Sequence, residues 1–432
     1  MRKVFKIKIL IIILALPVIG SAQNLRLSHL WSRTTICFDL NQLYNYNIYE
    51  GNRWGAGFNI TTPLHFDERY GYDFQNHLYA AANIGWGTGD EAWKWGVDAA
   101  LRFPRYVFRG VYASYHHDIE RIGNHSFISY NIFNTFDNSS YFSSRYSGID
   151  RLTAGIQLDL PGKSFLSLEY RHSAERLLFN AVGPLYPAKY DDEAMPKNYF
   201  DEAHVTLSYG KDWLLDLLFG KVQLNGCGPA GDIQLNDHFW RLLMQYSHSF
   251  EFKGKWGSLS VFAQAGTTGL EDSPISRRFD LSGAGGSIYY FRNTLLTVRP
   301  NTFMADGFLL GSLCYNFGIP LWSLRISKPR PFIQLNAMWG MLYGKNEKIY
   351  DIQSGHLIGE DPSYAGLPTA IRLTAPDDGL LEPVVGLDGL LEWGALDVGV
   401  AAALQLTPQK AIYHSDNFSD IFSVMAIVKL KL

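Results

Sequence analysis

The feature of the sequence that most restricts its fold is a repeated alternation of apolar and polar residues. The stretch 151–171 shows it twice, in two runs of about ten residues that flank the turn 161–164. A period of two places the apolar residues on one face of a strand and the polar residues on the other face. The alternation therefore predicts a β-hairpin whose strands have one apolar and one polar face.

The pattern recurs along the chain and predicts about sixteen antiparallel strands. They are expected to start near Thr34, Trp54, Asn76, Ala92, Val107, Arg151, Phe165, Phe200, Trp213, His238, Gly257, Ala305, Pro331, Glu382, Ala395 and Asp420. Short turns and long loops alternate between them, and a tilted strand of about ten residues crosses a bilayer. The predicted fold is an all-β, transmembrane antiparallel β-barrel. The alternative is a soluble secreted β-sandwich, whose strands would have about five or six residues and a polar outer face.

The composition favours the barrel. Aromatic residues make up 15% of the chain and charged residues 18%, with 40 glycines, which suits strands that meet lipid on one face and water on the other. The formal net charge of −3 argues against nucleic acid as a partner. We expect outer-membrane lipids and lipopolysaccharide around the strands, whereas the sequence does not identify surface or periplasmic protein partners. Tryptophans near predicted strand ends would form an interfacial girdle: Trp86, Trp93, Trp95, Trp213, Trp256, Trp339 and Trp393.

Residues 1–22 have the features of a secretory signal peptide. Arg2 and Lys3 precede the apolar run Ile9–Ile19, and small residues at 20–22 suit cleavage. A transmembrane helix is the alternative, but the run is shorter than the roughly 18 residues that such a helix needs. We therefore expect residues 23–432 to form one barrel domain, without a periplasmic domain, in the bacterial outer membrane.

No motif of an enzyme, a cofactor site or a metal site competes with the strand signal. His116 and His117 are adjacent, so on a strand they point to opposite faces and cannot easily share a metal ion. The three cysteines predict no disulfide framework. The chain is therefore expected not to be an enzyme. The alternative is an outer-membrane hydrolase with a catalytic residue near the rim, for which His172 and His204 are candidates.

The long loop 269–303 combines features of an ordered segment. Arg277, Arg278 and Phe279 are followed by three glycines that permit close backbone approach, Gly283, Gly285 and Gly286. We expect this loop to fold into the lumen, where one of the two arginines would pair with a lumenal carboxylate: Asp98, Asp159, Glu169 or Asp397. The alternative is a mobile surface loop with solvated arginines.

The barrel is expected to close between its first and last strands. An open edge would leave backbone groups unpaired in lipid, at several kcal/mol for each group. We predict that residues 34–40, with Cys37, pair with residues 422–432, with Val424, Ala426 and Val428 as the facing positions.

One motif resembles a known family. The run Pro274, Arg277-Arg278-Phe279, Leu281 and Gly285-Gly286 is similar to the loop before strand twelve in surface-antigen (BamA/TamA-like) outer-membrane barrels. The stretches 49–51, 86–95 and 306–321 resemble the barrel half of large Bacteroidota surface proteins that carry a carboxypeptidase-regulatory-like module. The resemblance implies a non-enzymatic role in assembly, translocation or anchoring of surface components. The alternative is a diffusion pore for small solutes.

Overall fold

The computed structural model describes most of the predicted strands and parts of their connections. The described residues are 25–31, 34–39, 42–47, 50–64, 76–104, 106–123, 145–179, 197–228, 231–253, 256–269, 273–281, 283, 285, 290, 293–299, 302–344, 347–351, 357–359, 370–393, 396–407 and 421–430. The main sheet of this part of the chain has 18 strands. The proposed signal peptide lies outside it.

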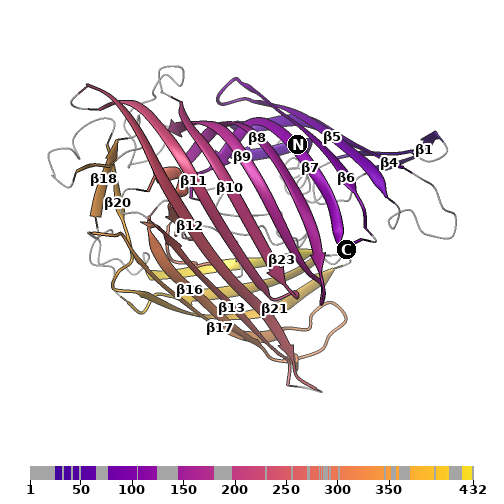
Figure 1. The fold of residues 1–432 in the computed structure, drawn as a ribbon. Coiled ribbons are helices and arrows are strands. Elements are labelled where there is room, and N and C mark those ends of the chain that lie inside the picture. Colours follow the sequence, from indigo (N-terminus) through magenta and orange to yellow (C-terminus); the bar gives the residue numbers. More distant parts are fainter. Residues whose placement is uncertain are drawn as a thin grey trace, which may run out of the picture. The chain divides into compact units, whose positions relative to one another are not determined.

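The chain divides into two compact units. Unit 1 comprises residues 1–121, 126–207 and 218–238, and unit 2 comprises residues 122–125, 208–217 and 239–432. In each unit, most strands of the main sheet pair antiparallel with the main-sheet strands that come before and after them along the chain (Figure 1).

Unit 1 contains the first nine strands. They are β1 (Leu25–Trp31), β2 (Thr34–Phe38), β3 (Tyr44–Asn47), β4 (Gly51–Pro63), β5 (His77–Gly87), β6 (Trp93–Arg102), β7 (Phe108–Arg121), β8 (Arg145–Leu160) and β9 (Ser164–Phe179). The strands from β4 to β9 pair in sequence order, and the hairpin β8–β9 is in register from Leu160 opposite Ser164 to Arg145 opposite Phe179. The residues of β10 (Asn198–Tyr209), β11 (Trp213–Gly228) and β12 (Gly231–Glu251) are divided between the units.

Unit 2 continues the meander from the second part of β12. Its strands are β13 (Ser258–Thr268), β16 (Gly307–Asn316), β17 (Arg330–Met341), β21 (Leu380–Trp393), β22 (Leu396–Leu404) and β23 (Phe422–Leu430). Short elements lie in the connections: the 3-10 helix η4 (Ile275–Arg277), the pair β14 (Phe279–Asp280) and β15 (Met304–Ala305), and a small sheet of β18 (Glu347–Asp351), β19 (Leu357–Gly359) and β20 (Ala370–Thr374).

The predicted all-β, antiparallel fold is confirmed. Each of the sixteen expected strands is present, and the main sheet has two additional strands, β1 and β3, that the sequence pattern did not indicate. Strands such as β8 and β9, with 16 residues each, are far longer than the five or six residues of a typical sandwich strand. The sandwich alternative is therefore wrong.

Side chains alternate between two faces of the sheet. In unit 2 the exposed face carries apolar residues, with Leu309 at 55% and Leu313 at 47% exposed, whereas Phe308 and Cys314 on the opposite face are 2% and 3% exposed. In unit 1 Val97 and Leu152 are likewise exposed. We call the exposed side the apolar face and the other the second face. Long antiparallel strands with such a face match the lipid-facing surface of outer-membrane proteins, the location that the sequence predicts.

The predicted partner of residues 34–40 is wrong. Both edges of β2 are occupied, because Cys37 lies opposite Arg26 of β1 on one side and opposite Asn59 of β4 on the other. A strand with two neighbours has no edge left for β23. On β23, the positions predicted to face residues 34–40 pair with β22 instead, and Val424 lies opposite Ala402. That the opposite edge of β23 closes the barrel, with Ala426 and Val428 at the closure, stays a prediction.

Candidate functional site

The candidate site is formed by the described residues between β13 and β16, most of which are buried in unit 2 instead of standing in solvent. Ile275, Arg278, Phe279 and Leu281 are all at most 2% exposed. Asp280 donates its backbone N–H to the carbonyl oxygen of Gly123, at 3.0 Å. The described part of this segment, which we call the loop segment, is therefore an integral layer of the unit.

An ion pair fixes the first half of the loop segment. Nη1 of Arg278 bonds Oδ1 of Asp306, and both side chains are fully buried. The Arg278 Nε donates to the carbonyl oxygen of Ser273 at 3.1 Å. The Asp306 Oδ2 accepts the backbone N–H of Tyr343 at 2.8 Å. Each charge thus has a charged partner and further hydrogen bonds, the condition under which a buried ion pair is tolerated.

Phe279 is held in an aromatic pocket beside this pair. Its ring centroid lies 4.8 Å from that of Phe308, and the guanidinium of Arg241 lies 4.5 Å from the Phe279 ring. Gly266 on β13 leaves space for both rings, because a Cβ there would come within 2.4 Å of Phe308 and 2.7 Å of Phe279. The strand therefore provides a recess for the loop residue.

The two described glycines of the motif are positions of close backbone approach. A Cβ on Gly283 would lie 2.4 Å from the Val298 carbonyl oxygen, and one on Gly285 would lie 2.6 Å from the Thr297 carbonyl oxygen. The Gly285 N–H donates to the Val298 oxygen at 2.6 Å. The loop segment thus folds back on itself at these residues. Gly286 lies outside the described residues.

A buried carboxylate that the sequence analysis missed fixes the second half of the loop segment. Glu382 on β21 is 0% exposed. It accepts the backbone N–H groups of Leu296 and Thr297 at 2.9 and 2.8 Å, and the Thr297 hydroxyl at 2.6 Å. Asn336 on β17 donates to it at 2.9 Å. In the sequence, Glu382 is a single acidic residue near the start of a predicted strand. Its place as the third residue of β21, on the second face, is the only sequence signal that would indicate a buried carboxylate.

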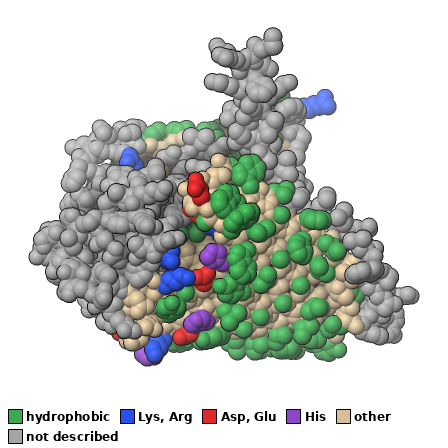
Figure 2. Space-filling view, turned by 90° about the horizontal axis from the view of Figure 1, so that it is seen from above, with side chains coloured by type: hydrophobic (Ala, Val, Ile, Leu, Met, Phe, Trp, Pro, Cys, Tyr) green, Lys and Arg blue, Asp and Glu red, His purple; other side chains and the backbone are tan. Residues whose placement is uncertain are grey.

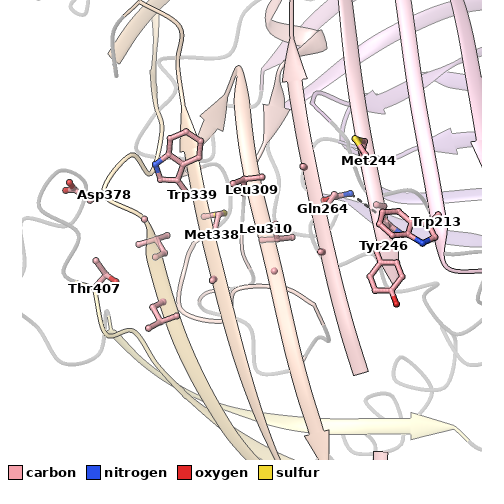
Figure 3. A pocket seen from close by; sticks show the side chains of 18 residues that line it. Trp213, Met244, Tyr246, Gln264, Leu309, Leu310, Met338, Trp339, Asp378 and Thr407 are labelled. Carbon is pink, nitrogen blue, oxygen red and sulfur yellow. Dashed lines mark hydrogen bonds between the residues drawn. The ribbon is translucent and has the colours of Figure 1, made fainter. Parts of the chain in front are cut away.

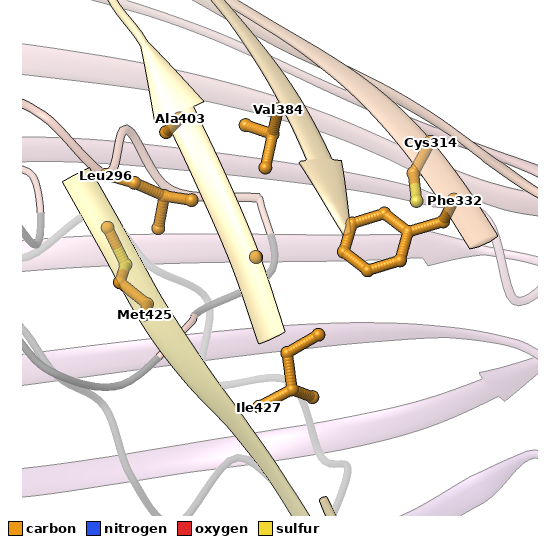
Figure 4. Close-up of a cluster of buried hydrophobic side chains, with 8 residues drawn as sticks. Leu296, Cys314, Phe332, Val384, Ala403, Met425 and Ile427 are labelled. Atoms are coloured by element: carbon orange, nitrogen blue, oxygen red, sulfur yellow. The ribbon is translucent and has the colours of Figure 1, made fainter. Parts of the chain in front are cut away.

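Apolar contacts complete the burial of this half. Leu296 belongs to a cluster of buried side chains from five strands, namely Cys314, Phe332, Val384, Ala401, Ala403, Met425 and Ile427 (Figure 4). Tyr290 packs against this cluster, and its N–H donates to the Ala426 carbonyl oxygen at 2.8 Å. The second face of unit 2 is therefore covered by its own loop segment.

Arg278 pairs with Asp306, which was not among the carboxylates expected as partners of the arginines. Asp98, Asp159 and Glu169 bond His116, Arg109 and Arg171 of their own unit, and Asp397 lies opposite Lys429 on β23. Asp306 was not considered because it follows the loop directly, one residue before β16. Arg277, 7% exposed, donates to the Ser276 hydroxyl at 3.1 Å.

The histidines considered for metal binding or hydrolysis are not brought together. His116 bonds Asp98, whereas His117 bonds Asp150. His172 bonds Asp201, and His204 lies 3.6 Å from a Glu169 oxygen. In the described part of the chain no three His, Cys, Asp or Glu side chains are grouped as a metal site would require.

A separate hollow of about 720 Å³ lies on the apolar face of unit 2 (Figure 3). Ala263, Gly311 and Ala337 are opposite one another across β13, β16 and β17, which makes a row of small residues. Trp213 and Trp339 are among the larger side chains that line it. The hollow belongs to the apolar surface and not to the buried loop. No helix among the described residues is long and apolar enough to span a membrane.

Neither a protein-family model nor a curated protein matches the sequence. Solved structures with similarity include BamA from Haemophilus ducreyi lacking POTRA domains 1-3, at 11% identity and TM-score 0.49, over 92% of this chain and 70% of that chain. CdiB from Acinetobacter baumannii is similar at 10% identity and TM-score 0.41, over 88% and 57%. CdiB from Escherichia coli is similar at 12% identity and TM-score 0.38, over 93% and 63%. The chain thus spans less than two thirds of either CdiB.

Proposed function

We propose that this chain is a non-enzymatic outer-membrane β-barrel whose lumen is closed at rest by the loop segment, and that it works in assembly, translocation or anchoring of surface components. The observation that carries the proposal is the buried pair of Arg278 and Asp306. A charge pair with both side chains fully buried holds the loop against the second face, the side that lines the lumen in such a barrel.

The loop segment has the attachment expected of a plug. Asp306 binds Arg278 in its first half, and Glu382 binds the backbone of Leu296 in its second half. The Leu296 side chain also packs in the apolar cluster. A buried carboxylate that accepts several N–H donors is strongly stabilised in place. An open diffusion pore would have no use for two buried anchors of this kind.

The second candidate is a diffusion pore for small solutes. It is favoured by the second face of unit 1, where a hollow of about 540 Å³ is lined by charged and hydroxyl side chains, among them Asp98, Arg102, Tyr112, Glu169 and Arg171. Such a surface would remain hydrated and suit polar solutes.

Conductance in planar bilayers separates the two candidates. We expect the wild-type protein to open rarely and briefly, and Arg278→Glu to open far more often, because a second acid next to Asp306 repels the loop from its site. Arg109→Glu, at a half-exposed ion pair on β7, is the control and should behave as the wild type. Stable, large openings of the wild type would favour the diffusion pore.

The non-enzymatic part has its own test. Hydrolase activity of the purified protein that disappears in His172→Ala or His204→Ala would overturn it. Proteins that co-purify after crosslinking in cells would identify the surface component.

A further inference from the structure

A band of polar side chains interrupts the apolar face of unit 1. His117 on β7, Asp150 on β8, His172 on β9, Asp201 on β10 and Lys221 on β11 occupy positions on this face, which elsewhere carries Val97, Leu152 and Leu168. In Figure 2 most of the charged and histidine side chains in view gather along one border of a largely hydrophobic surface. Charge on a lipid-facing surface is unfavourable at mid-membrane, by about 2–4 kcal/mol for Arg or Lys, so its position along the strands decides its meaning.

The polar residues lie at one common level. Counted from the strand ends at the short turns (Phe108, Leu160, Ser164, Tyr209 and Trp213), they are residues 10, 11, 9, 9 and 9 of their strands. A tilted transmembrane strand needs about 9–11 residues to cross the hydrocarbon. The band therefore lies where the hydrocarbon ends and the lipid headgroups begin, on the side of the long loops.

The carboxylates of the band already have donors. Asp150 accepts bonds from Nδ1 of His117 and, at 2.7 Å, from Nζ of Lys197. Asp201 accepts bonds from the Tyr170 hydroxyl at 2.7 Å and from Nδ1 of His172 at 2.8 Å. The acids thus fix the orientation of the basic groups.

The groups that remain available are donors. The side chains of His117 and His172 are 47% and 50% exposed, and that of Lys197 is 41% exposed. An ammonium has three donors, so Lys197 can bind an anion while it stays bonded to Asp150, and a protonated histidine can do the same at Nε2. Lys221 is exposed and close enough to Asp201 to interact with its charge. Phosphate oxygens accept strong, charge-assisted hydrogen bonds from such donors.

We infer that this band binds the phosphorylated headgroup of an outer-leaflet glycolipid such as lipopolysaccharide, with Lys197, Lys221, His117 and His172 as the phosphate donors. The inference rests on the proposed outer-membrane function, because long loops face outward in such barrels. Tyr170, Trp95 and Tyr115 lie on the same face and supply the amphipathic rings that favour this level of a membrane.

The test compares two glycolipids on the folded protein. Detergent-purified protein is titrated with lipid A that carries its phosphates, and with the same lipid after enzymatic dephosphorylation, and bound lipid is counted by native mass spectrometry. We expect the wild type to bind the phosphorylated form about tenfold more tightly, and Lys197→Gln/Lys221→Gln to lose the preference. The control, Lys163→Gln/Lys211→Gln, removes two lysines at the short turns and should keep it.

Two further measurements make the outcome decisive. The thermal midpoints of both double variants should equal that of the wild type, which shows that they are folded. Insertion into phosphatidylethanolamine vesicles, followed by protease protection of the strands, tests the membrane location separately. Equal binding of both glycolipids by an inserted wild type, or an unchanged preference in Lys197→Gln/Lys221→Gln, would overturn the inference and leave the proposed function intact.

Discussion

At the scale of single residues, the structure separates two ion pairs that look alike in the sequence. Arg278 and Asp306 are fully buried, whereas Arg109 and Asp159 are 49% and 34% exposed. Arg278→Met should lower the free energy of unfolding by about 3–5 kcal/mol, because it leaves a buried carboxylate uncompensated. Arg109→Met should lower it by about 0–1 kcal/mol, since water already screens that pair. Urea titration of vesicle-inserted protein checks both, and equal losses would contradict the burial argument.

Residue chemistry was only partly readable from the sequence. Arg278, Phe279 and the glycines stood out because a long loop with such residues is unusual. Asp306 and Glu382 did not, because a carboxylate's importance depends on which backbone N–H groups reach it, and these come from 37 residues downstream at Tyr343 and 86 residues upstream at Leu296. Local patterns contain no information on such distant pairs.

At the scale of elements, the strands could be predicted from the sequence, but the pairing partners of β2 could not. Alternation fixes which face each residue of β8 or β16 occupies, since the side-chain period is two. The neighbour of β2 depends instead on β1 (Leu25–Trp31), which follows the signal-like segment without a clear alternation of its own. The sequence analysis therefore gave β2 the wrong partner, although its start at Thr34 was correct.

This arrangement gives an element-scale prediction. In a variant that retains only Cys37, Asn59→Cys should form a disulfide with it under mild oxidation, because the two residues face each other across β2 and β4. Directly opposite side chains in antiparallel strands have Cβ atoms about 4.5–5.5 Å apart. Val424→Cys serves as the control and should not crosslink. A disulfide between Cys37 and Val424→Cys, with none to Asn59→Cys, would support the predicted closure between residues 34–40 and 422–432 and contradict the observed register.

At the scale of the whole molecule, the exposed apolar face is the feature that most strongly indicates contact with lipid. Leu313→Arg places a charge in the middle of β16 on that face, where it should destabilise the vesicle-inserted protein by about 2–4 kcal/mol. Leu64, just beyond the end of β4, is 54% exposed and Leu313 is 47% exposed, but Leu64 lies near the interface, where about 0–1 kcal/mol is expected for Leu64→Arg. Unfolding in urea measures both. Equal small effects would indicate that water, and not lipid, covers β16.

The anchoring of the loop segment also affects the order of events when the protein is assembled in the membrane. The groups that hold its second half all follow it in the chain: Glu382, Asn336, which donates to the Thr294 carbonyl oxygen, and the Ala426 carbonyl. A polypeptide that enters the membrane from its N-terminal strands onward would therefore carry Tyr290, Leu296 and Thr297 without these partners until β21 and β23 had arrived. In the proposed barrel, the lumen would be closed by the last strands to be added, so completion of the protein and closure of its lumen would be one event.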